Sequence, residues 1–450
     1  MSHVNGDPTA PPHQQACVPG NGAGDDELPP PTDGTRPGPL SEAALLGRKT
    51  PAVAGPIAAP PTEGTLGEYR ALVGLLLGYA LLICGNGLFQ TLIPLRMLRD
   101  GDSTLVVGFV QSSYYLGFLL GALLARRLID RIGQHRVFIA FSAAAAILAI
   151  TFSVAESATA LALIRLLTGF AFMGLYSSIE SWLNGTVSND RRGQIFGSYT
   201  AVNYLALAAG QMLLNIDDPT GSMRFSLTAV LFAAAVIPVS LLEGWPTKVA
   251  DASLEPMREH TSREIVVAMM QATPLAVPGC VLAGFLYSGF YSLMPVYLAR
   301  SGFTTSELSM FMGSCLFGAL ATQWPTGRLS DRTDRRRLVY RFALLSLALS
   351  AALALFPSRG VVWVATIVYV AVTFTQYGLI VSHTNDRAEP HLRVAISSML
   401  LVLFSIGGMT GPAIASLFMT ALGPRGLFVF NALTCAGLSL AAKRALGPSR

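Results

Sequence analysis

Two charged side chains lie inside long apolar stretches of the sequence. Arg165 stands among leucine, isoleucine and alanine, and an unpaired charge in such surroundings costs several kcal/mol inside a bilayer. Because a guanidinium group does not release its proton at physiological pH, we expect Arg165 to hold an anionic substrate or to lower the pKa of a nearby carboxyl group. The alternative is a side chain that extends to the outer membrane interface.

Glu180 is the second such residue, and it follows Arg165 by 15 positions. On a helix this separation is about 22 Å along the axis, with the two side chains about 60° apart around it. The two residues therefore share a broad face but cannot touch. Glu180 is either a carboxylate that carries a proton or a latch partner for Arg126 and Arg131, and we favour the latch.

Uncharged polar and aromatic side chains recur in the same apolar stretches. A cavity lined by amides and phenols suits a small organic molecule with rings or hydrogen-bonding groups. A hydrogen bond between two helices explains any single one of them equally well, but as a set they predict a polar cavity. The candidate lining residues are Asn86, Gln90, Gln111, Tyr115, Tyr199, Asn203, Tyr287, Tyr291 and Gln376.

Motifs for other kinds of chemistry are missing from the sequence. There is no GxxxxGK[ST] phosphate-binding loop, no GxSxG and no HExxH, which argues against a primary pump and against an enzyme. The five cysteines form no CxxC or Cys/His cluster, so we expect no metal site and no cofactor. The net charge of +5 is attributed to loops that set membrane topology, and no nucleic-acid partner is expected.

The candidate residues must be positioned by helices that cross a membrane. The chain is 52% hydrophobic and 13% charged, whereas soluble domains are about 25% charged. Runs of about 20 apolar residues have the length that spans the hydrocarbon layer as a helix, and they are too continuous for barrel strands. We expect an all-α membrane protein with twelve transmembrane helices. The expected spans are 71–97, 104–128, 136–155, 158–183, 194–215, 224–242, 274–298, 307–328, 337–356, 361–382, 392–421 and 426–445.

The sequence repeats itself at an offset of 201 residues. Residues that match without a gap include the pairs Phe89/Phe290, Pro94/Pro295, Gly117/Gly318 and Asp130/Asp331. Six spans per repeat give two halves with the same orientation, and transporters of this build bind their substrate between the halves and rock one half against the other. We expect two pseudo-symmetric six-helix bundles at 68–242 and 273–450, joined by a cytoplasmic loop at 243–272.

The distribution of basic residues predicts the orientation. The loops after even-numbered spans hold sixteen Lys and Arg residues, and those after odd-numbered spans hold six. The positive-inside rule then places the even-numbered loops and both termini in the cytoplasm. Residues 1–67 contain 13 of the 27 prolines, and we expect them to form a disordered cytoplasmic tail.

A charged motif follows the eighth span and recurs in weaker form after the second. The later copy contains Gly327, Asp331 and Arg332, and the earlier copy contains Asp130 and Arg131. Each aspartate can bind a neighbouring arginine and face a helix N-terminus of the other half. Such a contact would hold the cytoplasmic side closed and break when the halves rock, so we expect these residues to form a gate.

The motif, a glycine four residues before Asp-Arg and then a basic cluster, resembles the signature loop of the major facilitator superfamily. Each copy departs from it at one position, with Arg126 in place of the first glycine and Asp334 in place of the second. Arg165 followed by Gly169 resembles the fourth-span motif associated with proton-coupled members. The fifth span lacks the Gly-Pro motif of the superfamily's drug–proton antiporters, which argues against that group.

A closer likeness is to the YcaD-like branch of bacterial permeases, whose substrates are poorly defined. It rests on Leu293-Met294-Pro295, on Gln323-Trp324-Pro325 and on Glu180-Ser181. The resemblance covers residues 70–447. It implies a monomeric secondary active transporter in the bacterial inner membrane that moves a small organic solute by alternating access, coupled to protons. The alternatives are a non-transporting receptor or scaffold whose output is the tail, and an uncoupled facilitator.

Overall fold

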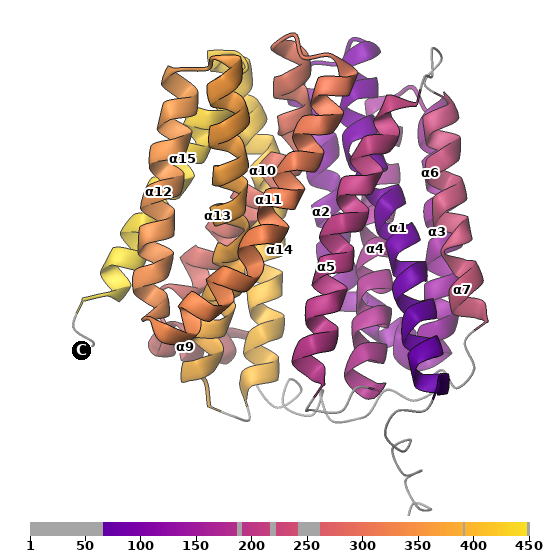
Figure 1. Ribbon diagram of the computed structural model, residues 1–450, viewed down its shortest axis with the longest axis horizontal. Coiled ribbons are helices and arrows are strands. Elements are labelled where there is room, and N and C mark those ends of the chain that lie inside the picture. Colours follow the sequence, from indigo (N-terminus) through magenta and orange to yellow (C-terminus); the bar gives the residue numbers. More distant parts are fainter. Residues whose placement is uncertain (1–65, 187–190, 217–221, 242–261, 390–391, 448–450) are drawn as a thin grey trace, which may run out of the picture. The chain divides into compact units, whose positions relative to one another are not determined.

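The computed structural model describes residues 66–186, 191–216, 222–241, 262–389 and 392–447, and every regular element in those ranges is a helix (Figure 1). The all-α prediction is confirmed there. Nearly all of the proline-rich stretch expected as a tail, and most of the loop expected at 243–272, lie outside the described residues.

The helices fall into two sets separated by a short helix. The N-terminal half comprises α1 (Leu66–Arg99), α2 (Thr104–Ile132), α3 (Gln134–Val154), α4 (Ala158–Thr186), α5 (Arg192–Met212) with the 3-10 turn η2 (Leu213–Asn215), α6 (Ser222–Ala234) and α7 (Val236–Ser240). The short helix α9 (Ser262–Ala272) follows, within the stretch expected as a loop. The C-terminal half comprises α10 (Ala276–Arg300), α11 (Thr305–Arg332), α12 (Arg335–Leu355), α13 (Arg359–Arg387), α14 (Arg393–Leu422) and α15 (Gly426–Ala445).

The expected spans coincide with these helices to within a few residues at most ends. The sixth span is the one that breaks, between α6 and α7. Pro238 has no N–H to donate, and its ring clashes with the carbonyl four residues earlier. That residue is Ala234, where α6 ends.

Ten helical segments in the described part of the chain are long and apolar enough to cross a membrane, with α6 and α7 counted together. The fifth and eighth expected spans are α5 and α11, which are long enough but less apolar. These two helices pack against each other across the two halves. Part of each surface therefore contacts protein rather than lipid, which explains why their sequences carry more polar residues.

The internal repeat is visible in the helix bounds. Adding 201 to the bounds of α3, 134–154, gives 335–355, which are the bounds of α12, and the same shift carries α4, 158–186, onto α13, 359–387. The turns that precede α2 and α11 also match, because Gly101 and Gly302 both have a positive φ, +92° and +76°. The prediction of two halves built on one pattern agrees with this geometry.

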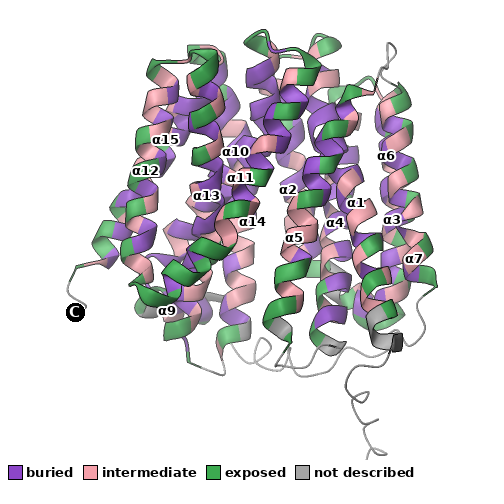
Figure 2. Ribbon diagram, viewed as in Figure 1, coloured by how far each residue is buried: buried purple, intermediate pink, exposed green. Residues whose placement is uncertain are grey.

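Each half is held together by the same pairs of helices. In the N-terminal half α1 packs on α5, α2 on α4 and α3 on α6; in the C-terminal half α10 packs on α14, α11 on α13 and α12 on α15. Buried and exposed stretches alternate along the helices (Figure 2). Large apolar side chains such as Ile147 and Val230 remain exposed, as expected for surfaces that face lipid.

Glycines set the closest of these helix contacts. A Cβ atom at Gly117 of α2 would lie 1.8 Å from the Leu166 carbonyl oxygen, and one at Gly169 of α4 would lie 1.9 Å from the Tyr114 carbonyl oxygen. Only glycine allows two backbones to approach so closely. The glycine of the fourth-span motif is therefore explained by packing. A Cβ atom at Gly407 of α14 would meet the Val281 carbonyl oxygen of α10 in the same way, at 2.0 Å.

We expect Gly169→Ala to lower the free energy of unfolding by about 3 kcal/mol, the upper end of the usual cost of overpacking. The added methyl group would meet a backbone oxygen, which cannot move aside as a side chain can. Gly378→Ala on α13 is the matched control, because nothing lies within 4 Å of its Cβ position. Thermal unfolding of both variants in one detergent makes the comparison, and equal midpoints would contradict the packing account.

Candidate functional site

Arg165 lies on α4, in contact with α1 and α2, and its side chain is fully buried. Its Nη2 donates to Gln90 Oε1 on α1 over 2.8 Å, and its guanidinium carbon lies 4.4 Å from the ring centre of Tyr114 on α2. The close approach of the α4 backbone at Gly169 to the α2 backbone at Tyr114 brings Tyr114 next to Arg165. The side chain therefore does not extend to a membrane interface.

No carboxylate in the described part of the chain neutralises this guanidinium. Its Nε and Nη1 atoms have no hydrogen-bond partner, and its electrostatic neighbours are the phenols of Tyr114 and Tyr115. The expected role of lowering the pKa of a nearby carboxyl group has no carboxyl group to act on in this arrangement. What remains is a buried positive charge whose field is strengthened by the low dielectric around it.

Glu180 lies on α4, six residues before the end of the helix, and tyrosines from three helices surround it. Tyr199 Oη on α5 donates to Glu180 Oε1 over 3.3 Å. The Tyr199 ring stacks on Tyr79 of α1, with ring centres 4.5 Å apart. Tyr79 in turn meets Tyr176 edge-on at 6.3 Å, and Tyr176 precedes Glu180 by one helical turn. We call these four residues the Glu180 cluster.

Glu180 lies near the boundary between the two halves. Tyr377, on α13 of the C-terminal half, interacts electrostatically with it, and Glu180 nevertheless remains exposed to solvent. Because Glu180 interacts with groups of both halves and is still in contact with water, it lines the boundary between them. Arg131, one expected latch partner, is exposed, and Glu180 accepts from Tyr199 instead. The side chain of Arg126, the other expected partner, lies outside the described residues.

The C-terminal half contributes aromatic rings to the same boundary. Tyr287 and Tyr291 on α10 have ring centres 4.8 Å apart, and Tyr287 lies 4.7 Å from Phe374 on α13. The Tyr287 hydroxyl interacts electrostatically with the hydroxyls of Tyr115 and Tyr204 in the N-terminal half. Both predicted tyrosines of α10 therefore lie where the halves face each other.

The other predicted lining residues divide into four groups. Asn203 joins the Glu180 cluster by accepting from Tyr79 Oη over 2.7 Å. Gln111 and Asn86 are buried with amide atoms that have no partner among the described residues, which is common where a ligand or water binds. Tyr115 packs over Gly408 of α14. Gln376 instead donates to Ser346 Oγ on α12 over 3.2 Å, a bond between two helices of one half.

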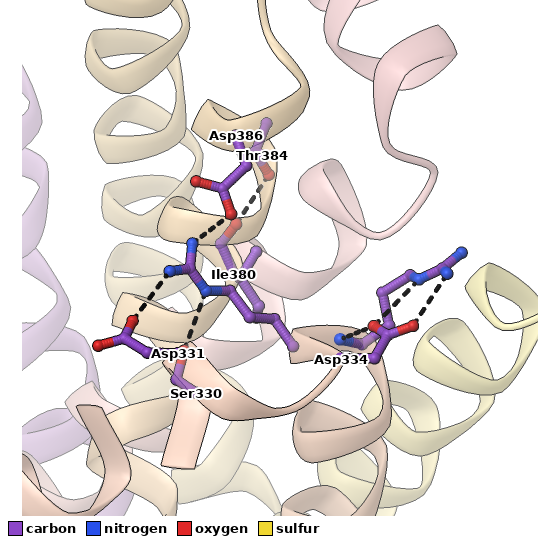
Figure 3. Close-up of polar contacts among 8 residues, drawn as sticks. Ser330, Asp331, Asp334, Ile380, Thr384 and Asp386 are labelled. Carbon is purple, nitrogen blue, oxygen red and sulfur yellow. Dashed lines mark hydrogen bonds and ion pairs between the residues drawn. The ribbon is translucent and has the colours of Figure 1, made fainter. Parts of the chain in front are cut away.

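The later copy of the loop motif forms an ion-pair network (Figure 3). Arg335 pairs with Asp386 on α13 and, at 3.4 Å, with Asp331 on α11. Asp334 caps α12 by accepting from the backbone N–H of Arg336 over 2.9 Å. Hydrogen bonding to the Arg336 side chain holds the pKa of the Asp334 carboxyl below its ordinary value.

A polar pocket of about 360 Å³ lies beside this ion-pair network. It is lined by Ser330, Asp331, Thr333, Asp334, Arg335, His383, Asp386 and Arg387.

The earlier copy of the motif lacks the matching partners. The 201-residue shift relates Arg335 to Gln134, which donates to Ser181 Oγ over 2.7 Å, and relates Asp386 to Gly185. Asp130 is exposed. The two gates expected from the sequence therefore differ, since Asp331 is paired within its own half, whereas no ion pair of Asp130 is found among the described side chains. Arg332 is exposed, and Gly327 borders open space.

The two halves are joined by hydrogen bonds at one end and at mid-depth. We call the end that carries the α2–α3 and α11–α12 connections the motif end, and the opposite end the far end. Two of these bonds lie at the far end and two closer to the middle. They join Asn215 to Ser309 over 3.0 Å, Ser309 to the Gln211 carbonyl over 2.6 Å, the Ala413 amide to Ser112 over 3.1 Å, and Gln323 to Tyr204 over 3.2 Å.

Several residues of the site were not selected from the sequence. Tyr79 and Tyr176 of the Glu180 cluster and Tyr114 beside Arg165 are the main ones. Tyr176 could have been selected from the sequence, because it lies four residues before Glu180, the single acidic residue of the fourth span. Tyr79 could not, since its contact with Tyr199 joins residues 120 positions apart in the chain.

The sequence profile of the Major Facilitator Superfamily matches residues 75–402. Proteins named uncharacterized MFS-type transporter YcaD, from Salmonella newport and Salmonella typhi, are each 27% identical over 369 residues, which cover 81% of this chain and 92% of the relative. The fold is similar to that of a bacterial homologue of the human lysosomal transporter Spinster in an inward-facing, unoccupied conformation, with a TM-score of 0.70, 14% identity, and coverage of 85% and 98%. It is also similar to a variant of the nucleoside transporter NupG, with a TM-score of 0.68, 15% identity, and coverage of 84% and 100%.

Proposed function

The chain belongs to the Major Facilitator Superfamily and is a membrane transporter, not an enzyme, and from this premise we propose that it moves a small organic solute by proton-coupled alternating access, with Glu180 as the group that carries the proton. The tyrosines that both halves turn toward their common boundary support an organic solute with rings or hydrogen-bonding groups.

One observation carries the proton coupling. Glu180 is the only acidic residue of the described helices that lies more than one turn from a helix end. It is also exposed at the boundary between the halves. A group that binds and releases protons during a transport cycle must be membrane-embedded, ionisable and reachable by water from one side at a time. Arg165 cannot do this, because its guanidinium does not release a proton.

The arrangement of contacts supports alternating access. The halves are bonded at the far end, and Glu180 lies nearer the motif end. The bias of Lys and Arg assigns the motif end to the cytoplasm, so we propose that this is an inward-facing state with both termini inside. Opening the far end would require the bonds of Ser309 and Ser112 to break.

We assign Arg165 the role of an electrostatic barrier. Its fixed charge lies toward the far end of α4, about 22 Å from Glu180 along the helix, and it is not neutralised by any described carboxylate. An unpaired arginine in a pore repels protons and other cations. It would therefore keep a proton at Glu180 from leaking to the far side while the far end is closed.

A ligand screen followed by a proton-flux assay tests the proposal. Purified protein is first screened for thermal stabilisation by metabolites and drugs at an acidic and at a neutral pH, because a ligand at 100 times its dissociation constant stabilises by about 2.7 kcal/mol. Each hit is then added to proteoliposomes loaded with a pH-sensitive dye. We expect each transported hit to drive a proton flux proportional to its own flux. Solute flux without proton flux would favour the uncoupled facilitator.

A further inference from the structure

The Glu180 cluster has the composition of a site for an organic cation. Glu180 offers a negative charge, and Tyr79, Tyr176 and Tyr199 offer three rings that contact one another beside it. The face of an aromatic ring attracts a cation, most strongly where water is excluded, and cages of aromatic rings hold quaternary ammonium groups in this way. Tyr377, in the other half, also interacts electrostatically with Glu180.

The cluster contains nothing that would neutralise Glu180 in place of a ligand. Its hydrogen bond comes from a neutral phenol at 3.3 Å, and no Lys or Arg among the described residues pairs with it. Arg165 is too far along the same helix to do so. A carboxylate that faces a membrane-embedded space must be charge-compensated by a proton or by another cation.

We infer that the transported solute is an organic cation, an amine or quaternary ammonium compound that carries at least one ring, and that it competes with the proton for Glu180. This inference rests on the proposed function and names its substrate class. When the cation binds at the Glu180 cluster, the carboxyl O–H bond breaks and the proton passes to water at the motif end. When the cation leaves, the carboxylate takes a proton from water. The cycle therefore exchanges one monovalent cation for one proton.

The groups that face Glu180 set the pH dependence of this competition. They are phenols on α1, α4, α5 and α13. An ordinary tyrosine ionises only near pH 10, so these groups keep their charge state between about pH 5 and 8. Helices α2 and α3 pack on α4, and none of the charged or titratable side chains described on them is among the groups that act on Glu180. Glu180 is thus the group expected to govern cation binding in this range.

The inference does not depend on the missing Gly-Pro motif of the fifth span. That motif marks one group of exchangers within the superfamily, whereas binding of an organic cation needs only an accessible carboxylate and rings that can surround an ammonium group. Benzyltrimethylammonium is a suitable probe because it has a permanent charge and one ring. Benzyl alcohol is the neutral control, and phenylacetate is the control of opposite charge.

Isothermal titration calorimetry of the full chain in detergent tests the inference. We expect benzyltrimethylammonium to bind about tenfold more tightly for each unit that the pH rises below the pKa of Glu180, and to release one proton per cation, measured in two buffers of different ionisation enthalpy. We expect Glu180→Gln to weaken its binding at least tenfold and to remove the pH dependence. Tyr176→Leu should weaken binding severalfold while Tyr176→Phe, which keeps the ring, should not.

Two results would overturn the substrate class. One is equal binding of benzyltrimethylammonium to the wild type and to Glu180→Gln, with both shown to be folded by their unfolding midpoints. The other is tighter binding of phenylacetate than of the cation. His135→Asn is the control variant for the pH dependence, and a pH dependence that vanishes in it would also contradict the inference. Proton flux that depends on Glu180 but is driven only by neutral or anionic solutes would leave the proposed function in place. It would contradict only the assignment of an organic cation as the substrate class.

Discussion

Glu180→Gln should abolish uphill transport while leaving downhill exchange of the solute intact. Glutamine has the size of glutamate and can still accept the hydrogen bond from Tyr199, but it has no proton to lose at any physiological pH. A variant fixed in the neutral form can still rock between its two states with solute bound. We expect accumulation driven by a pH gradient to fall at least 100-fold, whereas counterflow of labelled solute stays within a few-fold of the wild type at solute concentrations high enough to saturate the more weakly binding variant.

Accumulation and counterflow are measured in one preparation of proteoliposomes. Accumulation is measured with a pH gradient, and counterflow with unlabelled solute inside and no gradient. Asp386→Asn is the matched control, because it removes a carboxylate of the loop motif that pairs with Arg335 outside the Glu180 cluster. We expect it to slow transport in both assays equally. Undiminished gradient-driven accumulation by Glu180→Gln would remove Glu180 from the coupling mechanism.

Arg165→Met should produce a protein that is at least as stable as the wild type but cannot accumulate solute. Methionine fills much of the same volume without a charge. Because the guanidinium is buried with two nitrogen atoms unpartnered, its removal should not cost stability, and replacing buried charges by apolar groups is often neutral or stabilising by about 1–4 kcal/mol. Gln90 would lose its donor, so the double variant with Gln90→Leu is the cleaner test of stability.

The barrier assigned to Arg165 predicts how transport fails in this variant. We expect a proton leak without solute in dye-loaded proteoliposomes, at a rate well above that of the wild type, and with it the loss of uphill accumulation. Arg165→Ala should behave in the same way, and Arg165→Lys should retain a low leak because it keeps the charge. Uphill transport by Arg165→Ala at the wild-type rate would show that the residue has no part in coupling.

The helices and their repeat were predictable from the sequence because the bilayer imposes a length and a composition on each span. The expected twelfth span, 426–445, coincides with α15. The offset of 201 residues found in the sequence also relates the bounds of α3 and α12. The hydropathy of α5 and α11 falls below that of the other spans because these helices face each other as well as lipid.

The partners of the site residues were less predictable. Spacing along one helix placed Arg165 and Glu180 apart, and the structure agrees, but it could not show that Glu180 meets Tyr199 rather than Arg131. Such contacts join different helices, and their register depends on close packing at residues such as Gly169. Gln376 illustrates the same limit, since its bond to Ser346 is set by the rotation of α13 against α12.

The four bonds between the halves join neutral groups, whereas the motif end is rich in charge. Dissolved salt screens interactions between exposed charges over roughly 10 Å at 0.1 M and leaves hydrogen bonds between buried neutral groups almost unaffected. Ionic strength therefore acts on the two ends unequally. If the motif end faces the cytoplasm, as we propose, a rise in cytoplasmic salt would weaken charged contacts that close this end without loosening the far end. The transporter would then spend longer in the state that faces the cell interior.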